Sequence, residues 1–146
     1  MTGDRPSTCV LLPCSAGEYW ALPQCCLGEI VAVPAEGQQP PAQFDWRGLQ
    51  LPVLNRWKGA GWSDPRSGTG LVAVLLPLSG ERGTCWGLAL GNQGPQIAEL
   101  QAGEIEELPP AGADKFLAAF RLGGSVCQVP DLRAWETIMA ASGAAA

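Results

Sequence analysis

The chain has 146 residues, of which 47 % are hydrophobic and 16 % are charged, and this length is typical of one domain with a proper core. Its formal net charge of −5 argues against a nucleic-acid partner, because such partners bind basic surfaces. No segment approaches the run of roughly 18 apolar residues that a membrane span requires, which argues against direct membrane insertion. The 19 glycines and 13 prolines disfavour long helices and favour short strands joined by turns.

The N-terminal residues lack the basic and apolar segments of a secretory signal, so we expect a cytoplasmic protein. In a reducing compartment, cysteines are more often thiols than disulfides. The six cysteines are Cys9, Cys14, Cys25, Cys26, Cys85 and Cys127. No pair has Cys-x-x-Cys spacing and the chain has no histidine, so the sequence predicts no metal site.

The usual side chains of catalysis are also missing from the sequence. Without histidine there is no general base that titrates near neutral pH, and no Cys-His or Ser-His pair. No phosphate-binding or dinucleotide-binding glycine motif occurs, so we expect no cofactor. The adjacent Cys25 and Cys26 are the one enzyme-like feature left, and a thiol-dependent protein that uses them is an alternative. We therefore predict no catalytic residues and a protein that works by binding.

The first third of the chain predicts short strands. An apolar run from Cys9 to Leu12, a turn around Gly17 and a second run from Tyr19 to Leu22 indicate a hairpin. Residues 24–33 fit either a strand or a bent connection, because the periodicity of so few residues does not distinguish the two. Residues 35–43 are rich in Pro, Gln and Gly and predict a loop.

The stretch from Phe44 to Asn55 predicts a turn, formed by Arg47 and Gly48, that leads into a strand with one buried face. The side chains of one parity are Leu49, Leu51 and Val53. Pro52 limits this strand to the edge of a sheet, or to a position whose N–H needs no partner. On the residues alone, this segment is either a site for another protein or an ordinary edge strand with a solvated arginine.

The middle of the second half predicts further strands, at residues 71–78, 85–90 and 96–100. The first is nearly continuous in aliphatic residues, which is typical of a central strand. In the third, we expect Ile97 and Leu100 to point inward. Glu104, Glu106 and Glu107 then predict an acidic, solvated bend.

A last hairpin and a helix complete the chain. Four side chains share one parity of the strand that precedes Gly123-Gly124: Phe116, Ala118, Phe120 and Leu122. The glycine pair is typical of a tight hairpin turn, and residues 126–129 return from it. Asp131 is a candidate N-cap for a helix whose apolar stripe is Leu132, Trp135, Ile138 and Met139. This stripe either packs on the domain's own sheet or binds a partner.

The order of these segments resembles the CheW-like coupling proteins of bacterial chemosensory arrays, over roughly residues 8 to 140. The most specific part is Arg47-Gly48-x-x-Leu51-Pro52-Val53-Leu54, which is similar to the family's Asn-Leu-Arg-Gly-x-x-x-Pro-Val-x-Asp signature. Trp46 stands where the family usually has Leu, and Asn55 where it has Asp. The chain thus resembles a divergent member.

The resemblance implies a mainly β fold: two packed, five-stranded, SH3-like β-barrels with a short C-terminal helix. It implies one domain over residues 8–142, with flexible tails at 1–7 and 143–146. It further implies a non-enzymatic adaptor that couples receptor signalling tips to the regulatory domain of a CheA-type histidine kinase. Divergent members also serve systems that control type IV pili and twitching. The alternative is a generic SH3-like protein-binding module outside chemosensing.

Position by position, the resemblance implies a partner-binding site. Arg47 and Gly48 match the signature pair, and Trp46 precedes them. Leu27 and Glu29 match the segment on the same receptor-facing side. A guanidinium at a turn suits polar capture of a helical tip.

Overall fold

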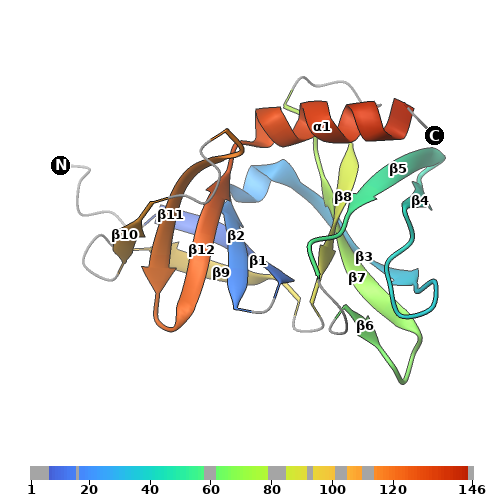
Figure 1. The fold of residues 1–146 in the computed structure, drawn as a ribbon, viewed down its shortest axis with the longest axis horizontal. Coiled ribbons are helices and arrows are strands. Elements are labelled where there is room, and N and C mark those ends of the chain that lie inside the picture. The colour runs from blue at the N-terminus through green and yellow to red at the C-terminus, as the bar shows by residue number, and fades with distance from the viewer. Residues whose placement is uncertain are drawn as a thin grey trace.

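The computed structural model describes residues 7–15, 17–57, 62–78, 85–91, 94–100, 105–109 and 114–144. These residues form two curled β-sheets and one C-terminal helix (Figure 1). The first sheet has the order β10-β11-β12-β2-β1-β9. Its strands are β1 (Ser7–Ser15), β2 (Glu18–Leu22), β9 (Gln96–Leu100), β10 (Glu106–Leu108), β11 (Phe116–Leu122) and β12 (Ser125–Pro130).

The second sheet has the order β3-β7-β8-β5-β4, and a short strand, β6, pairs with β7 off this path. Its strands are β3 (Leu27–Pro34), β4 (Gln43–Trp46), β5 (Leu49–Leu54), β6 (Ser63–Asp64), β7 (Thr69–Leu75) and β8 (Trp86–Leu90). A 3-10 turn, η1 (Gln24–Cys26), carries the chain from the first sheet into the second. The chain returns to the first sheet at β9, so the two sheets interlock.

The predicted mainly β fold with two packed β subdomains and a C-terminal helix is confirmed. The first hairpin is confirmed by the antiparallel pairing of β1 with β2, where Leu12 lies opposite Trp20. Strand β7 is central, between β3 and β8. The Gly123-Gly124 turn is confirmed as well, because Leu122 pairs with Ser125 across it.

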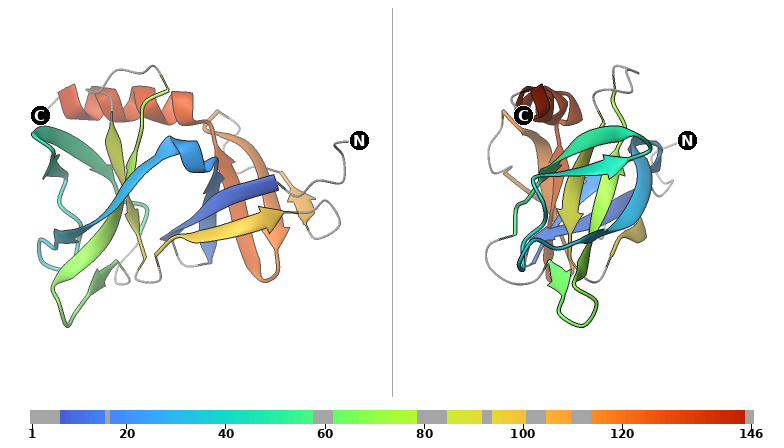
Figure 2. Two further views of the ribbon diagram at one scale, coloured as in Figure 1. Left: turned by 180° about the vertical axis from the view of Figure 1, so that it is seen from behind. Right: turned by 90° about the vertical axis from the view of Figure 1, so that its right-hand side faces the viewer.

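The helix α1 (Leu132–Ala144) begins beyond the end of β12 and runs across the second sheet, where it contacts β5 and β8 (Figures 1 and 2). Asp131 caps it: its carboxylate accepts the Ala134 N–H at 3.3 Å and its carbonyl accepts the Trp135 N–H at 3.0 Å. Trp135 and Met139 are each 4 % exposed, so the apolar stripe packs on the domain's own sheets. Ile138 is the exception, at 40 % exposed.

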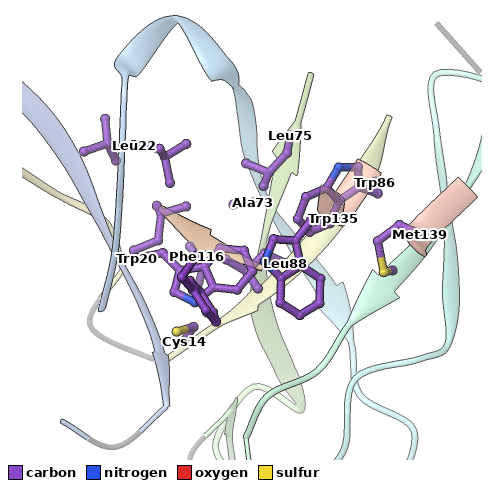
Figure 3. Packing of buried hydrophobic residues seen from close by; sticks show 13 residues of the cluster. Cys14, Trp20, Leu22, Ala73, Leu75, Trp86, Leu88, Phe116, Trp135 and Met139 are labelled. Atoms are coloured by element: carbon purple, nitrogen blue, oxygen red, sulfur yellow. The ribbon is translucent and has the colours of Figure 1, made fainter. Parts of the chain in front are cut away.

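The largest core lies between the two sheets and the helix (Figure 3). The first sheet contributes Leu12 and Trp20, the second contributes Leu75 and Leu88, and α1 contributes Trp135. Trp20 is at the centre of an aromatic group, since its ring lies 5.2 Å from Trp135, 5.7 Å from Phe116 and 6.3 Å from Trp86. Because both sheets bury side chains in one core, we expect them to unfold together.

Two expectations about strands need correction. Ile97 does not point inward and is 66 % exposed, because β9 is the last strand of its sheet. Phe116 does not share a face with Phe120 and Leu122, because the register of β11 shifts between Phe116 and Ala118. Phe116 packs in the core between the sheets, whereas Phe120 and Leu122 pack in a second cluster, and Ala118 is exposed.

For Pro52, the sequence left two positions open, and the edge of a sheet is not the one observed, because its strand β5 lies between β4 and β8. The alternative position predicted for Pro52 is the one observed. Its partner on β4 is Gln43, and the Val53 N–H donates to the Ala42 carbonyl at 2.9 Å. The alternation of an antiparallel ladder therefore gives the Pro52–Gln43 pair no hydrogen bonds.

Candidate partner-binding site

Arg47 and Gly48 form the two-residue turn of the β4–β5 hairpin, because Trp46 pairs directly with Leu49. Both turn residues have positive φ, 51° at Arg47 and 83° at Gly48. Two positive φ values define a type I′ turn, whose twist matches that of the strands it joins. A Cβ built on Gly48 would meet no atom within 4 Å, so glycine is required there by conformation and not by crowding.

Arg47 is the one non-glycine residue with positive φ in the described part of the chain. The first position of this turn normally holds Asn, Asp or Gly. An L-residue other than these costs about 1–2 kcal/mol in the left-handed region. Strain of this kind, held in place by its surroundings, is typical of functional positions.

Glu29 on β3 binds the strained Arg47 and the residue before it, Trp46. Its Oε1 accepts the Trp46 indole N–H at 3.0 Å and an Arg47 guanidinium N–H at 3.3 Å. The Arg47 guanidinium also stacks over the Trp46 ring, with Cζ 5.0 Å from the centroid. We call Glu29, Trp46 and Arg47 the turn cluster; it joins β3 to the β4–β5 hairpin.

The turn cluster is open to solvent. The Arg47 side chain is 68 % exposed and that of Glu29 is 42 % exposed. An ion pair this exposed contributes at most about 1 kcal/mol to stability. The cluster therefore holds a guanidinium and an aromatic ring in a fixed place at little benefit to the fold, which suits recognition of a partner.

Leu27 is the predicted site residue that the structure does not bring to the turn cluster. The β3–β7 register shifts between Leu27 and Glu29, so that Leu27 pairs with Leu75 and Glu29 with Val74. Leu27 is half-buried and packs against the core between the sheets. The register shift thus separates Leu27 from Glu29, which the family resemblance had placed on one receptor-facing side.

A second arginine–glutamate pair, Arg56 with Glu18, was not predicted. An Arg56 guanidinium N–H donates to Glu18 Oε1 at 3.3 Å, and the two side chains are only 29 % and 24 % exposed. Glu18 also accepts the Gln128 amide N–H at 3.1 Å and the Cys14 thiol at 3.5 Å. The Arg56 Cζ lies 5.5–5.8 Å from three rings, those of Phe116, Trp20 and Trp135.

This second pair connects the two sheets, because Glu18 begins β2 and Arg56 follows β5. We call Glu18, Arg56, Gln128 and Cys14 the joint. The sequence signal for it was slight: a cation between the polar Asn55 and the aromatic Trp57. Glu18 and Gln128 are 110 positions apart in the sequence, and a local sequence pattern cannot predict a contact over such a separation.

Burial raises the pKa of four of the thiols, those of Cys9, Cys14, Cys26 and Cys127. Burial, followed by the nearby Glu18 carboxylate, raises the pKa of Cys14 far above its ordinary value. Burial likewise raises the pKa of Cys127 to about 11 and raises the pKa of Cys26, to which Cys25 contributes. A raised pKa lowers the thiolate fraction, so this environment does not favour a thiol-dependent role for Cys26.

No group of three or more His, Cys, Asp or Glu residues suited to a metal ion occurs within the described ranges. No helix in the same ranges is long and apolar enough to cross a membrane.

Neither a family model nor a curated protein matches the sequence. The structure, however, is similar to the crystal structure of the scaffolding protein TtCheW from Thermoanaerobacter tengcongensis, with a TM-score of 0.57. The match covers 86 % of this chain and 89 % of that chain at 16 % sequence identity. The chain therefore has a CheW-like fold, and the fold that the resemblance implied is confirmed.

Proposed function

We propose that this chain is a non-enzymatic chemosensory adaptor of the cytoplasm, which couples receptor signalling tips to the regulatory domain of a CheA-type histidine kinase. The observation that carries the proposal is the turn cluster on a CheW-like fold. Arg47 holds a costly backbone conformation there, while its exposed ion pair returns little stability.

The chemistry of the turn cluster suits a helical partner. A guanidinium carries five N–H donors in a planar fork, and Arg47 directs one of them to Glu29. The remaining donors are available to carboxylates or carbonyls on a receptor tip. Trp46 and Glu29 fix the guanidinium in advance, which reduces the entropy lost on binding.

Two residues of the Phe44–Asn55 stretch differ from the family signature. Trp46 replaces the usual Leu, and its indole N–H gives Glu29 a bond that a Leu could not form. Asn55 replaces Asp and donates to the Gln39 side chain at 3.2 Å. From this divergence, we propose that the adaptor serves a system that controls type IV pili and twitching motility.

The test is a titration of the chain with receptor signalling tips and with the kinase regulatory domain. We expect Arg47→Glu to weaken binding of the tip at least about tenfold, because charge reversal beside Glu29 also removes the fork of donors. Arg121→Glu is the matched control, because Arg121 forms an exposed pair with Glu106 on the first sheet. Tip binding by Arg47→Glu at the wild-type affinity, with an unchanged far-UV CD spectrum, would overturn the proposal.

A further inference from the structure

Strands β3 and β4 are the two ends of the second sheet, and each pairs on one side only among the described strands. The sheet curls (Figure 2, right) so that these two ends line a common cavity of about 340 Å³. Its lining comes from both strands: Val31, Ala32, Val33 and Pro34 on β3, and Phe44, Asp45 and Trp46 on β4. This volume lies within the range of about 300–1,000 Å³ typical of ligand pockets. We call this space the β3–β4 groove.

The pairing registers show which backbone groups face the groove. On β4, the Val53 N–H donates to the Ala42 carbonyl, so alternate residues of the ladder bond to β5. Gln43 and Asp45 belong to the other set and direct their N–H and C=O groups away from β5, toward the groove. No strand within the described ranges pairs with this edge of β4.

The same reasoning applies to β3. The Ala35 N–H donates to the Gly68 carbonyl at 2.8 Å, which continues the ladder with β7 in which Val33 and Val31 are the bonded residues. Ala32 therefore directs its N–H and C=O groups away from β7 and into the groove. Both sides of the groove thus offer backbone donors and acceptors, and no partner for those of Ala32 or Asp45 occurs among the described residues.

The side chains of the groove indicate what its occupant carries. Val31, Val33 and Phe44 give it an apolar floor, and the exposed Asp45 places a carboxylate at its rim. The chain as a whole carries a net charge of −5. An occupant with alternating apolar side chains and a Lys or Arg opposite Asp45 meets both features.

We propose that the β3–β4 groove binds a partner protein through an extended, basic segment of about four or five residues, which adds to β3 and β4 as a strand. The four lining residues of β3 set this length, at roughly 3.3 Å per residue. Main-chain hydrogen bonds supply affinity in such strand addition, and alternate side-chain pockets supply specificity. A helical receptor tip bonds its own backbone internally, so this site goes beyond the proposed function and does not depend on it.

The probe is a display library of random 12-residue peptides, selected on the wild-type chain. We expect selected peptides to alternate apolar residues with Lys or Arg, and to protect the amides of Ala32 and Asp45 from hydrogen exchange. Ala32→Pro should weaken their binding about tenfold, because it removes an N–H that faces the groove and leaves the bonds to β7 intact.

Asp45→Lys is a second variant that involves no backbone change, and it should weaken the same peptides about tenfold by charge repulsion. Glu107→Lys is its control, since Glu107 is an exposed carboxylate on β10 of the other sheet. Selected peptides that bind Asp45→Lys as tightly as wild type, or that leave the Ala32 and Asp45 amides unprotected, would overturn the proposal. So would protection of these amides by self-association of the chain without peptide.

Discussion

The molecule contains two arginine–glutamate pairs that are alike in local geometry and opposite in setting. In both, guanidinium nitrogen and carboxylate oxygen lie 3.3 Å apart, and both arginines stack on tryptophan. In the joint, Arg56 and Glu18 are 29 % and 24 % exposed, whereas in the turn cluster Arg47 and Glu29 are 68 % and 42 % exposed.

The difference separates a structural role from a recognition role. Glu18 accepts hydrogen bonds from three segments of the chain and holds the Arg56 cation between the sheets, so its loss removes the carboxylate that compensates a partly buried cation. Glu29 holds two donors at the surface, where water can replace it. The Arg56–Glu18 pair therefore stabilises the fold, whereas the Arg47–Glu29 pair holds a guanidinium in a place where a partner can bind it.

The largest expected effect is in the joint. Glu18→Ala removes the carboxylate that accepts from the Arg56 guanidinium and the Cys14 thiol, so we expect a loss of about 2–3 kcal/mol in the free energy of unfolding. Glu29→Ala is the matched control, with an expected loss below about 1 kcal/mol. Urea denaturation of both variants measures the difference, and equal losses would contradict the distinction between the pairs.

Alkaline pH should also lower the free energy of unfolding, through the Cys14 thiol of the joint. The pKa of Cys14 is raised in the folded state, so its stabilising contribution is complete below the unfolded thiol pKa of about 8.5 and declines as pH rises above it. Between the unfolded and the folded pKa, a thiol of this kind lowers the free energy of unfolding by up to about 1.4 kcal/mol for each pH unit. Urea denaturation between pH 7.5 and 10 should show a shallower decline for Cys14→Ala than for wild type; an identical slope would be inconsistent with this reasoning.

The smallest expected effect is at the Arg47-Gly48 turn, where a substitution should raise the free energy of unfolding instead of lowering it. Arg47→Asn places a residue suited to positive φ in the type I′ turn, so we expect the free energy of unfolding to rise by about 0.5–1 kcal/mol. Thermal denaturation measures this gain, with Arg121→Asn as a control outside any turn. A loss of stability in Arg47→Asn would show that the exposed pair contributes more than its setting indicates.

The parts of the fold that the sequence predicted are those that local patterns determine. Alternation and turn residues identified the hairpins at Gly17 and Gly123-Gly124 and the turn at Arg47-Gly48, and helical spacing identified α1 from Asp131 onward. A register shift defeated the same reasoning in β11. It places Phe116 on the opposite face from Phe120 and Leu122, with which the alternation had grouped it.

For the candidate site, Glu29, Trp46 and Arg47 were named from the sequence by family resemblance, and the structure places them in mutual contact. The contact itself could not be predicted, because it depends on how the sheet curls between β3 and β4. The joint escaped sequence reasoning for the same reason, since Glu18, Arg56 and Gln128 come from three distant segments.

The most direct test of the two roles is the indole N–H region of a ¹⁵N-correlated NMR spectrum, recorded while a chemoreceptor signalling tip is added. The Trp46 indole donates to Glu29 in the turn cluster, whereas those of Trp20 and Trp135 are buried beside the joint. We predict that the Trp46 signal shifts with the titration and that the Trp20 and Trp135 signals stay in place. A saturating shift of the two buried indoles with Trp46 unmoved would contradict the assignment of recognition to the turn cluster.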